Sequence, residues 1–106
     1  MTVVQMKSKY GHKHLLADGH ANYSEAGTDI VCASVSILLQ SFIYHSQLAE
    51  GKKNVKITKL ESGPGFIHLI VHDPNGVLDD AFGLIKDGLT MLDEDYPEYV
   101  MLVGEK

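Results

Sequence analysis

The sequence predicts a small α+β domain in which a largely antiparallel sheet packs against two helices. Three observations predict this fold: paired segments in which apolar and polar residues alternate, two longer segments with helical spacing, and turn residues between them. The expected order is β-β-α-β-β-α-β, with hairpins that make most strand pairs antiparallel. A length of 106 residues suits a single domain over residues 1–106, and one cysteine excludes an internal disulfide.

The first two strands are predicted to form a hairpin. Thr2–Tyr10 alternates between apolar and polar positions, as a half-buried strand does. Gly11 marks a turn, and His12–Gly19 is the expected antiparallel partner. The residues expected to face the core are Val4, Met6, Leu15 and Ala17.

The next segment, Asp29–Ala49, has the period of a helix. Thr28 is the expected N-cap, Asp29 suits the positive end of the helix dipole, and Gly51 ends the helix. The breadth of its apolar stripe predicts a largely buried helix. The stripe contains Val31, Val35, Leu38 and Phe42, widened by Ile30, Ile37, Tyr44 and Leu48.

The second half of the chain repeats the strand-strand-helix order without repeating the sequence. Asn54–Leu60 and Phe66–His72 are predicted strands, joined by a turn over Glu61–Gly65. Val77–Leu92 is a predicted helix, and Tyr99–Val103 is a short final strand. Within the helix, Gly83 and Gly88 each cost about 1 kcal/mol relative to alanine. Its apolar face comprises Leu78, Ala81, Phe82, Ile85, Leu89 and Leu92.

Charge and hydropathy narrow the partners that we expect. The net charge of -5 and the pI near 5.6 argue against nucleic acid as the main ligand. A local group of lysines, Lys52, Lys53, Lys56 and Lys59, is expected to be a solvated loop and strand. No secretory signal is visible, and Ile30–Ile43 is too short and too polar to span a bilayer. We therefore expect a soluble cytoplasmic protein without membrane contact.

The six histidines raise the question of a metal site. His12 and His14 share one strand face, as do His68 and His72, and paired imidazoles can bind zinc. A structural zinc site needs four ligands, and the chain has no CxxC or HExxH motif. The sequence therefore favours ordinary surface or sheet histidines, with no metal.

Cys32 and His20 are the candidate catalytic residues. A thiol attacks carbonyls as the thiolate, and a helix start or a nearby imidazolium lowers its pKa. His20, at a predicted strand end, could act as the base, with Asp29 to orient it and first-turn amides to bind an oxyanion. Ser36 lies one turn after Cys32 on the same face. The alternative is structural, because cysteine often fills a core and a strand-end histidine often only makes a hydrogen bond.

Two segments of the sequence resemble a known family, and this resemblance favours a catalytic role for Cys32 and His20 over a structural one. Gly19-His20-Ala21, followed by the run from Asp29 to Ser36 (DIVCASVS), resembles the ribosomal-processing cysteine protease family Prp. The element order and the late segment Asp95–Tyr99 also resemble that family over nearly the whole chain. The resemblance implies a small α+β fold, a homodimer, and no metal or organic cofactor. It also implies cleavage of a short N-terminal extension from a bacterial large-subunit ribosomal protein.

The resemblance also assigns roles to residues of this chain. It implies that His20 and Cys32 form a catalytic dyad, that Asp29 supports it, and that Ser36 matches a family serine. The loop between the dyad residues is implied to move when substrate binds. Its residues are Ala21, Asn22, Tyr23, Ser24, Glu25, Ala26, Gly27 and Thr28.

Three positions depart from the family pattern. Ser34 replaces a usual alanine near the thiol, Asn22 replaces a common glycine, and Ala26 replaces a common aromatic residue. The two loop changes leave the substrate open. One alternative is a phage-associated relative that processes virion proteins such as capsid proteins. The other is a non-catalytic module that binds ribosomal or assembly proteins.

Overall fold

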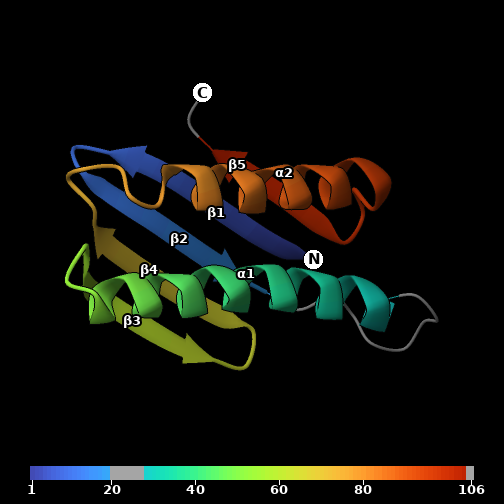
Figure 1. Cartoon of the computed structure of the whole chain (residues 1–106). Coiled ribbons are helices and arrows are strands. Elements are labelled where there is room, and N and C mark those ends of the chain that lie inside the picture. Colours follow the sequence, from blue (N-terminus) through green and yellow to red (C-terminus); the bar gives the residue numbers. More distant parts are fainter. Residues whose placement is uncertain (20–27, 105–106) are drawn as a thin grey trace.

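A five-stranded mixed sheet carries both helices on one face in the computed structural model, which describes residues 1–19 and 28–104 (Figure 1). The predicted element order is confirmed. The strands lie in the order β3-β4-β2-β1-β5, and every neighbouring pair is antiparallel except β1 and β5. The elements are β1 (Thr2–Lys9), β2 (His12–Asp18), α1 (Thr28–Gly51), β3 (Lys56–Gly63), β4 (Phe66–His72), α2 (Asp79–Asp95) and β5 (Val100–Gly104).

The core lies between the sheet and the two helices. Phe42 of α1 and Phe82 of α2 meet edge to face, with ring centroids 5.4 Å apart. A Cβ atom at Gly88 would lie 3.1 Å from Leu38, so this glycine permits close packing of the helices, whereas Gly83 faces open space. The fully buried side chains include Val4, Met6, Leu15, Val31, Leu39, Leu69, Val71, Leu78, Leu89 and Val100.

The hairpin of β3 and β4 differs from the predicted one. A five-residue turn was expected over Glu61–Gly65, but β3 continues to Gly63, which pairs with Phe66. The register shifts between Ile57 and Lys59, so the alternation of side chains along β3 is broken there. The sequence pattern therefore missed the last three residues of this strand, Glu61–Gly63.

Helix α1 is less buried than its apolar stripe predicted. Val31, Val35, Leu39 and Phe42 face the core, but Ile30, Ile37, Tyr44 and Leu48 are 67%, 64%, 64% and 50% exposed. The expectation of a largely buried helix is wrong, because its apolar residues occupy two different faces.

The length and composition of α1 also correct the membrane argument. Residues 30–51 form 22 residues with mean hydropathy 1.2, which is long and apolar enough to cross a membrane by length and composition alone. The expectation was argued from Ile30–Ile43 alone, and it does not hold for the longer helix that contains this segment. A helix that covers a sheet passes the same test, and α1 packs its Val35 and Phe42 side against the core.

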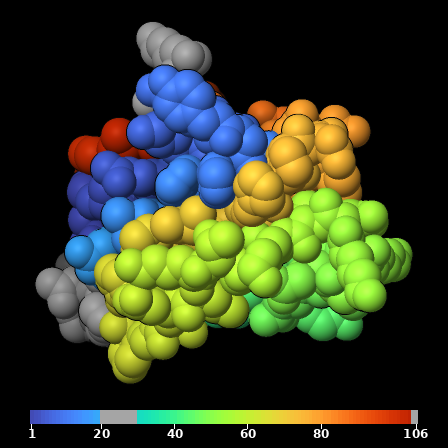
Figure 2. Space-filling view, turned by 90° about the vertical axis from the view of Figure 1, so that its left-hand side faces the viewer, coloured from blue at the N-terminus to red at the C-terminus, as the bar shows by residue number. Residues whose placement is uncertain are grey.

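A buried ion pair holds the start of α2 against the β1–β2 hairpin, at the end of the molecule that Figure 2 shows. The Asp73 carboxylate accepts hydrogen bonds from the amides of Val77 and Leu78 at 2.8 and 2.9 Å. The Lys13 ammonium, whose side chain is 4% exposed, lies 3.4 Å from Asp73 and 2.6 Å from Asp79. Asp73 thereby replaces an N-cap for α2, whose cap residue Leu78 makes no side-chain cap.

Candidate functional site

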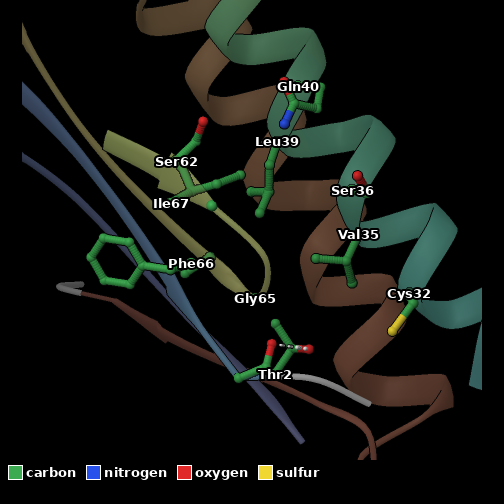
Figure 3. A pocket seen from close by; sticks show the side chains of 13 residues that line it. Thr2, Cys32, Val35, Ser36, Leu39, Gln40, Ser62, Gly65, Phe66 and Ile67 are labelled. Atoms are coloured by element: carbon green, nitrogen blue, oxygen red, sulfur yellow. Dashed lines mark hydrogen bonds between the residues drawn. The ribbon is translucent and has the colours of Figure 1, made fainter. Parts of the chain in front are cut away.

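The thiol of Cys32 lines a pocket of about 330 Å³ between α1, the start of β1 and the β3–β4 hairpin (Figure 3). The pocket has an apolar floor and a polar rim. The floor is formed by Ala17, Val35, Leu39 and Ile67 with the buried Thr2, and the rim by Ser36, Gln40 and Ser62. An extended peptide could place an apolar side chain on this floor and hydrogen-bond its backbone to the rim.

Cys32 is half-buried and unpaired, and its sulfur points from α1 into this space (Figure 3). Thr28 was expected to be the N-cap, which would place Cys32 in the first turn, but Thr28 is itself the first residue of the helix and Cys32 is the fifth. The amides that lack an acceptor within the helix therefore belong to residues 28–31. Helical side chains lean toward the N-terminus, so the Cys32 thiol still projects over that turn.

Ser36 and Gln40 follow Cys32 at intervals of one turn and extend the same wall of the pocket. The resemblance pointed to Ser36, and the structure brings it together with Cys32. Gln40, Thr2 and Ser62 were missed. The spacing of Gln40, eight residues after Cys32, could have revealed it, but Thr2 and Ser62 reach the pocket only through the sheet.

The histidine of the predicted dyad, His20, lies outside the described residues, as do loop residues 21–27. Asp29 belongs to the first turn of α1, and its side chain is likewise outside the description. The residue directly before His20 is described, and Gly19 lines the same pocket as Cys32. The described chain therefore stops at the edge of the thiol pocket.

Gly19 has a backbone conformation that favours glycine. Its φ is +103°, and a Cβ atom there would lie 2.3 Å from the Met1 carbonyl oxygen. Its amide donates to the Gly65 carbonyl at 3.0 Å, and its own carbonyl accepts the Thr2 hydroxyl at 3.4 Å. These contacts fix the end of β2 between the start of β1 and the β3–β4 turn.

Over residues 1–19 and 28–104, no group of three or more histidine, cysteine, aspartate or glutamate side chains is placed to hold a metal ion. The chemistry that the pocket offers is that of a thiol beside a cleft able to hold a peptide.

Comparison with known proteins identifies the relatives of this fold and pocket. A family model described as cysteine protease Prp matches residues 1–101. An essential ribosomal processing protease Prp from S. aureus, solved with a covalently linked product peptide, superposes with a TM-score of 0.76 at 24% identity, covering 99% of this chain and 100% of that chain. The same protease with a substrate peptide gives 0.68 at 22% identity, with the same coverage.

A third structure, SMU.848 from Streptococcus mutans, gives a TM-score of 0.64 at 22% identity. The match covers 99% of this chain and 96% of that chain. No functionally curated protein matches the sequence significantly.

Proposed function

The chain belongs to the Prp family of cysteine proteases, and we propose that it removes a short N-terminal extension from a large-subunit ribosomal protein in the bacterial cytoplasm. The observation that carries the proposal is the Cys32 thiol in a peptide-sized pocket whose opposite wall ends at Gly19, directly before His20. The resemblance of the fold to a protease solved with substrate and product peptides supports a peptide substrate.

In the proposed mechanism, Cys32 is the nucleophile and His20 moves the proton. His20 accepts the thiol proton, and the Cys32 sulfur attacks the scissile carbonyl to give a tetrahedral intermediate. Amides of residues 28–31 are placed to stabilise its oxyanion. The carbon–nitrogen bond then breaks as His20 protonates the leaving amine, and water hydrolyses the Cys32 thioester to return the enzyme.

The remaining residues of the predicted site take supporting roles in this proposal. Asp29 orients the base, and Ser36 hydrogen-bonds the substrate backbone from the rim of the pocket. Loop residues 21–27, together with Thr28, which was expected in the loop but begins α1, are assigned the substrate contacts, and Asn22 and Ala26 account for a choice of cleavage site.

The test is mass spectrometry of candidate substrates after incubation with wild type, Cys32→Ala and His20→Ala. Cleavage of the extended ribosomal protein should require both residues. Ser34→Ala is the matched control, because the Ser34 hydroxyl donates to the Ile30 carbonyl within the helix and the change restores the family residue, so this variant should cleave normally. Cleavage by Cys32→Ala would refute the mechanism. Capsid proteins in the same assay test the phage alternative, and cleavage of no candidate favours a binding module.

We also propose that the chain is a homodimer that buries the exposed stripe of α1. Ile30, Ile37, Tyr44 and Leu48 recur along one face of the helix and remain exposed in the described single chain. Exposed apolar patches of this kind mark protein interfaces. Light scattering should show a dimer for wild type and a monomer for Ile37→Glu/Tyr44→Glu, whereas a wild-type monomer at micromolar concentration would contradict the proposal.

A further inference from the structure

The face of the sheet opposite the helices carries a concentration of cationic side chains. Residues paired across adjacent strands share a face, and the register places four histidines together: His12 opposite His72, and His14 and His68 beside them. The His12 and His72 rings have centroids 4.8 Å apart. We refer to this part of the sheet, with the lysines below, as the histidine face.

Four lysines surround these histidines on the same side of the sheet. Lys7 pairs with His14 and Lys9 with His12 across β1 and β2. Lys56 pairs with His72, and Lys59 lies opposite Ile70, across β3 and β4. The register places two carboxylates on this face: Glu61, which lies 3.5 Å from Lys59, and Asp18, which lies opposite Phe66.

The acidic residues are concentrated on the other side of the molecule. Helix α2, with sequence DDAFGLIKDGLTMLDED, has six carboxylates and one lysine. The net charge of -5 is therefore the sum of the charges of an acidic helix, a basic sheet face and the rest of the chain. Net charge alone, on which the expectation of no nucleic acid was based, does not describe the potential at this face.

The histidine face is hollowed. A depression of about 410 Å³ is lined by Lys7, His14 and His68 together with the apolar side chains of Leu16 and Val103. It is formed by β1, β2, β4 and β5 and shares no lining residue with the Cys32 pocket. It offers cations and apolar contact within one site.

The electrostatics of His14 support an anion there. Burial lowers the pKa of His14, and the neighbouring His12, Lys7 and His68 lower it further. The imidazole therefore lies in a positive environment that disfavours its own proton. An anion in the depression would reverse this effect.

We propose that the histidine face binds single-stranded RNA, with phosphates held by its lysines and histidines and bases packed against its rings and apolar residues. Imidazole and phenyl rings on a sheet are suited to stacking on unpaired bases. Phe66 adjoins this surface: it pairs with Asp18 in the register and also lines the Cys32 pocket, with its ring directed away from Cys32 (Figure 3). An acidic peptide fits less well, because peptides usually add to a sheet edge and the histidines lie on the two inner strands β2 and β4.

The test is fluorescence anisotropy of a labelled RNA of about 12 nucleotides, titrated with full-length protein between about 50 and 200 mM salt. Four lysines would neutralise four phosphates. A plot of the logarithm of the association constant against the logarithm of the salt concentration should then have a slope of about -3, since each neutralised phosphate contributes about -0.7. Lys7→Gln/Lys59→Gln should weaken binding and reduce the magnitude of that slope by about 1.4. The matched control, Lys52→Gln/Lys53→Gln, removes the same charge outside the histidine face and should change the slope little.

A second arm measures the pH dependence. Wild-type affinity should rise as the pH falls from about 7.5 to 5.5, because a bound phosphate favours the protonated form of a nearby imidazole. His14→Asn/His68→Asn should flatten this rise. The charged groups facing these two histidines are Lys7, His12 and Glu61, which the double variant retains.

Three results would overturn the proposal. One is the absence of salt-dependent RNA binding by wild type. Another is equal weakening by the control variant, which would make the binding a property of total charge. The third is equally tight binding of a polyglutamate peptide or of anionic lipid vesicles, which would show that the face does not select RNA.

Discussion

Gly19→Ala should damage catalysis far more than it damages the fold. The residue lies between the start of β1 and the β3–β4 turn, and it directly precedes the proposed base His20. Its φ of +103° is one that alanine adopts at a cost of about 1–3 kcal/mol. Loss of its 3.0 Å bond to Gly65 would add about 0.5–1.5 kcal/mol.

The size of the catalytic effect follows from the steric conflict. The added Cβ would lie 2.3 Å from the Met1 carbonyl oxygen, and real Cβ contacts are essentially never shorter than 3.0 Å, so the backbone must shift by at least 0.7 Å. A misplacement of about 1 Å in catalytic geometry costs about 100-fold in rate. A destabilisation of about 2–4 kcal/mol leaves most domains folded, because they are stable by about 5–15 kcal/mol.

We therefore expect kcat/KM on the extended ribosomal protein to fall about 100-fold, with a urea midpoint that still shows a cooperative fold. Gly83→Ala is the control: a Cβ there meets nothing within 4 Å, and a helical alanine should stabilise by about 1 kcal/mol with unchanged activity. A folded Gly19→Ala enzyme with activity within about threefold of wild type, less than the effect expected for misplacement, would refute the reasoning that Gly19 positions His20.

Three further predictions concern stability. Asp73→Ala should lower the free energy of unfolding by about 3–5 kcal/mol in urea titrations, because two amides lose their acceptor and the buried Lys13 loses one of its two carboxylate partners, keeping Asp79; a loss under about 1 kcal/mol would show that Asp73 contributes no more than a surface ion pair does. Burial and positive neighbours lower the pKa of His14 in the folded state, so its contribution is present above about pH 6.5 and is lost as the pH falls through the folded-state pKa. His14→Asn should therefore lose less stability than wild type between about pH 7.5 and 5.5, and equal acid sensitivity would contradict this. Phe42→Ala should cost about 3–5 kcal/mol, measured by thermal unfolding, because its fully buried ring packs against Phe82.

The sequence was sufficient for the order of elements because each strand and helix shows its own period. Alternation placed Leu15 and Ala17 in the core, and helical spacing placed Leu89 there. The predictions were wrong for the end of β3 and for the burial of α1, where one segment of sequence has to satisfy two structural requirements. A bulge after Ile57 interrupts the period of β3, and apolar residues for two surfaces share α1, so exposure could not be separated from burial by composition alone.

Some residues of the candidate site could likewise be predicted from the sequence, whereas others could not. Cys32, Ser36 and Gln40 lie at intervals of one turn, which a local pattern can reveal. Thr2 and Ser62 reach the pocket from β1 and β3, which are separated along the chain but brought together by the order of strands in the sheet. No local period encodes that order. The histidine face depends on it too, because His12 and His72 become neighbours only when β2 pairs with β4.

Helix α1 presents three separate surfaces, and this separation makes the proposals independently testable. Each residue turns the helix by about 100°, so Val35 faces the core at the floor of the pocket, Ser36 faces the pocket opening, and Ile37 faces the solvent. A charge at Ile37 can therefore disrupt a dimer without entering the pocket or the core. If Ile37→Glu becomes monomeric yet cleaves the ribosomal protein at the wild-type rate, the dimer is unnecessary for catalysis. If activity falls in parallel with dissociation and returns at high protein concentration, the dimer supports the active site.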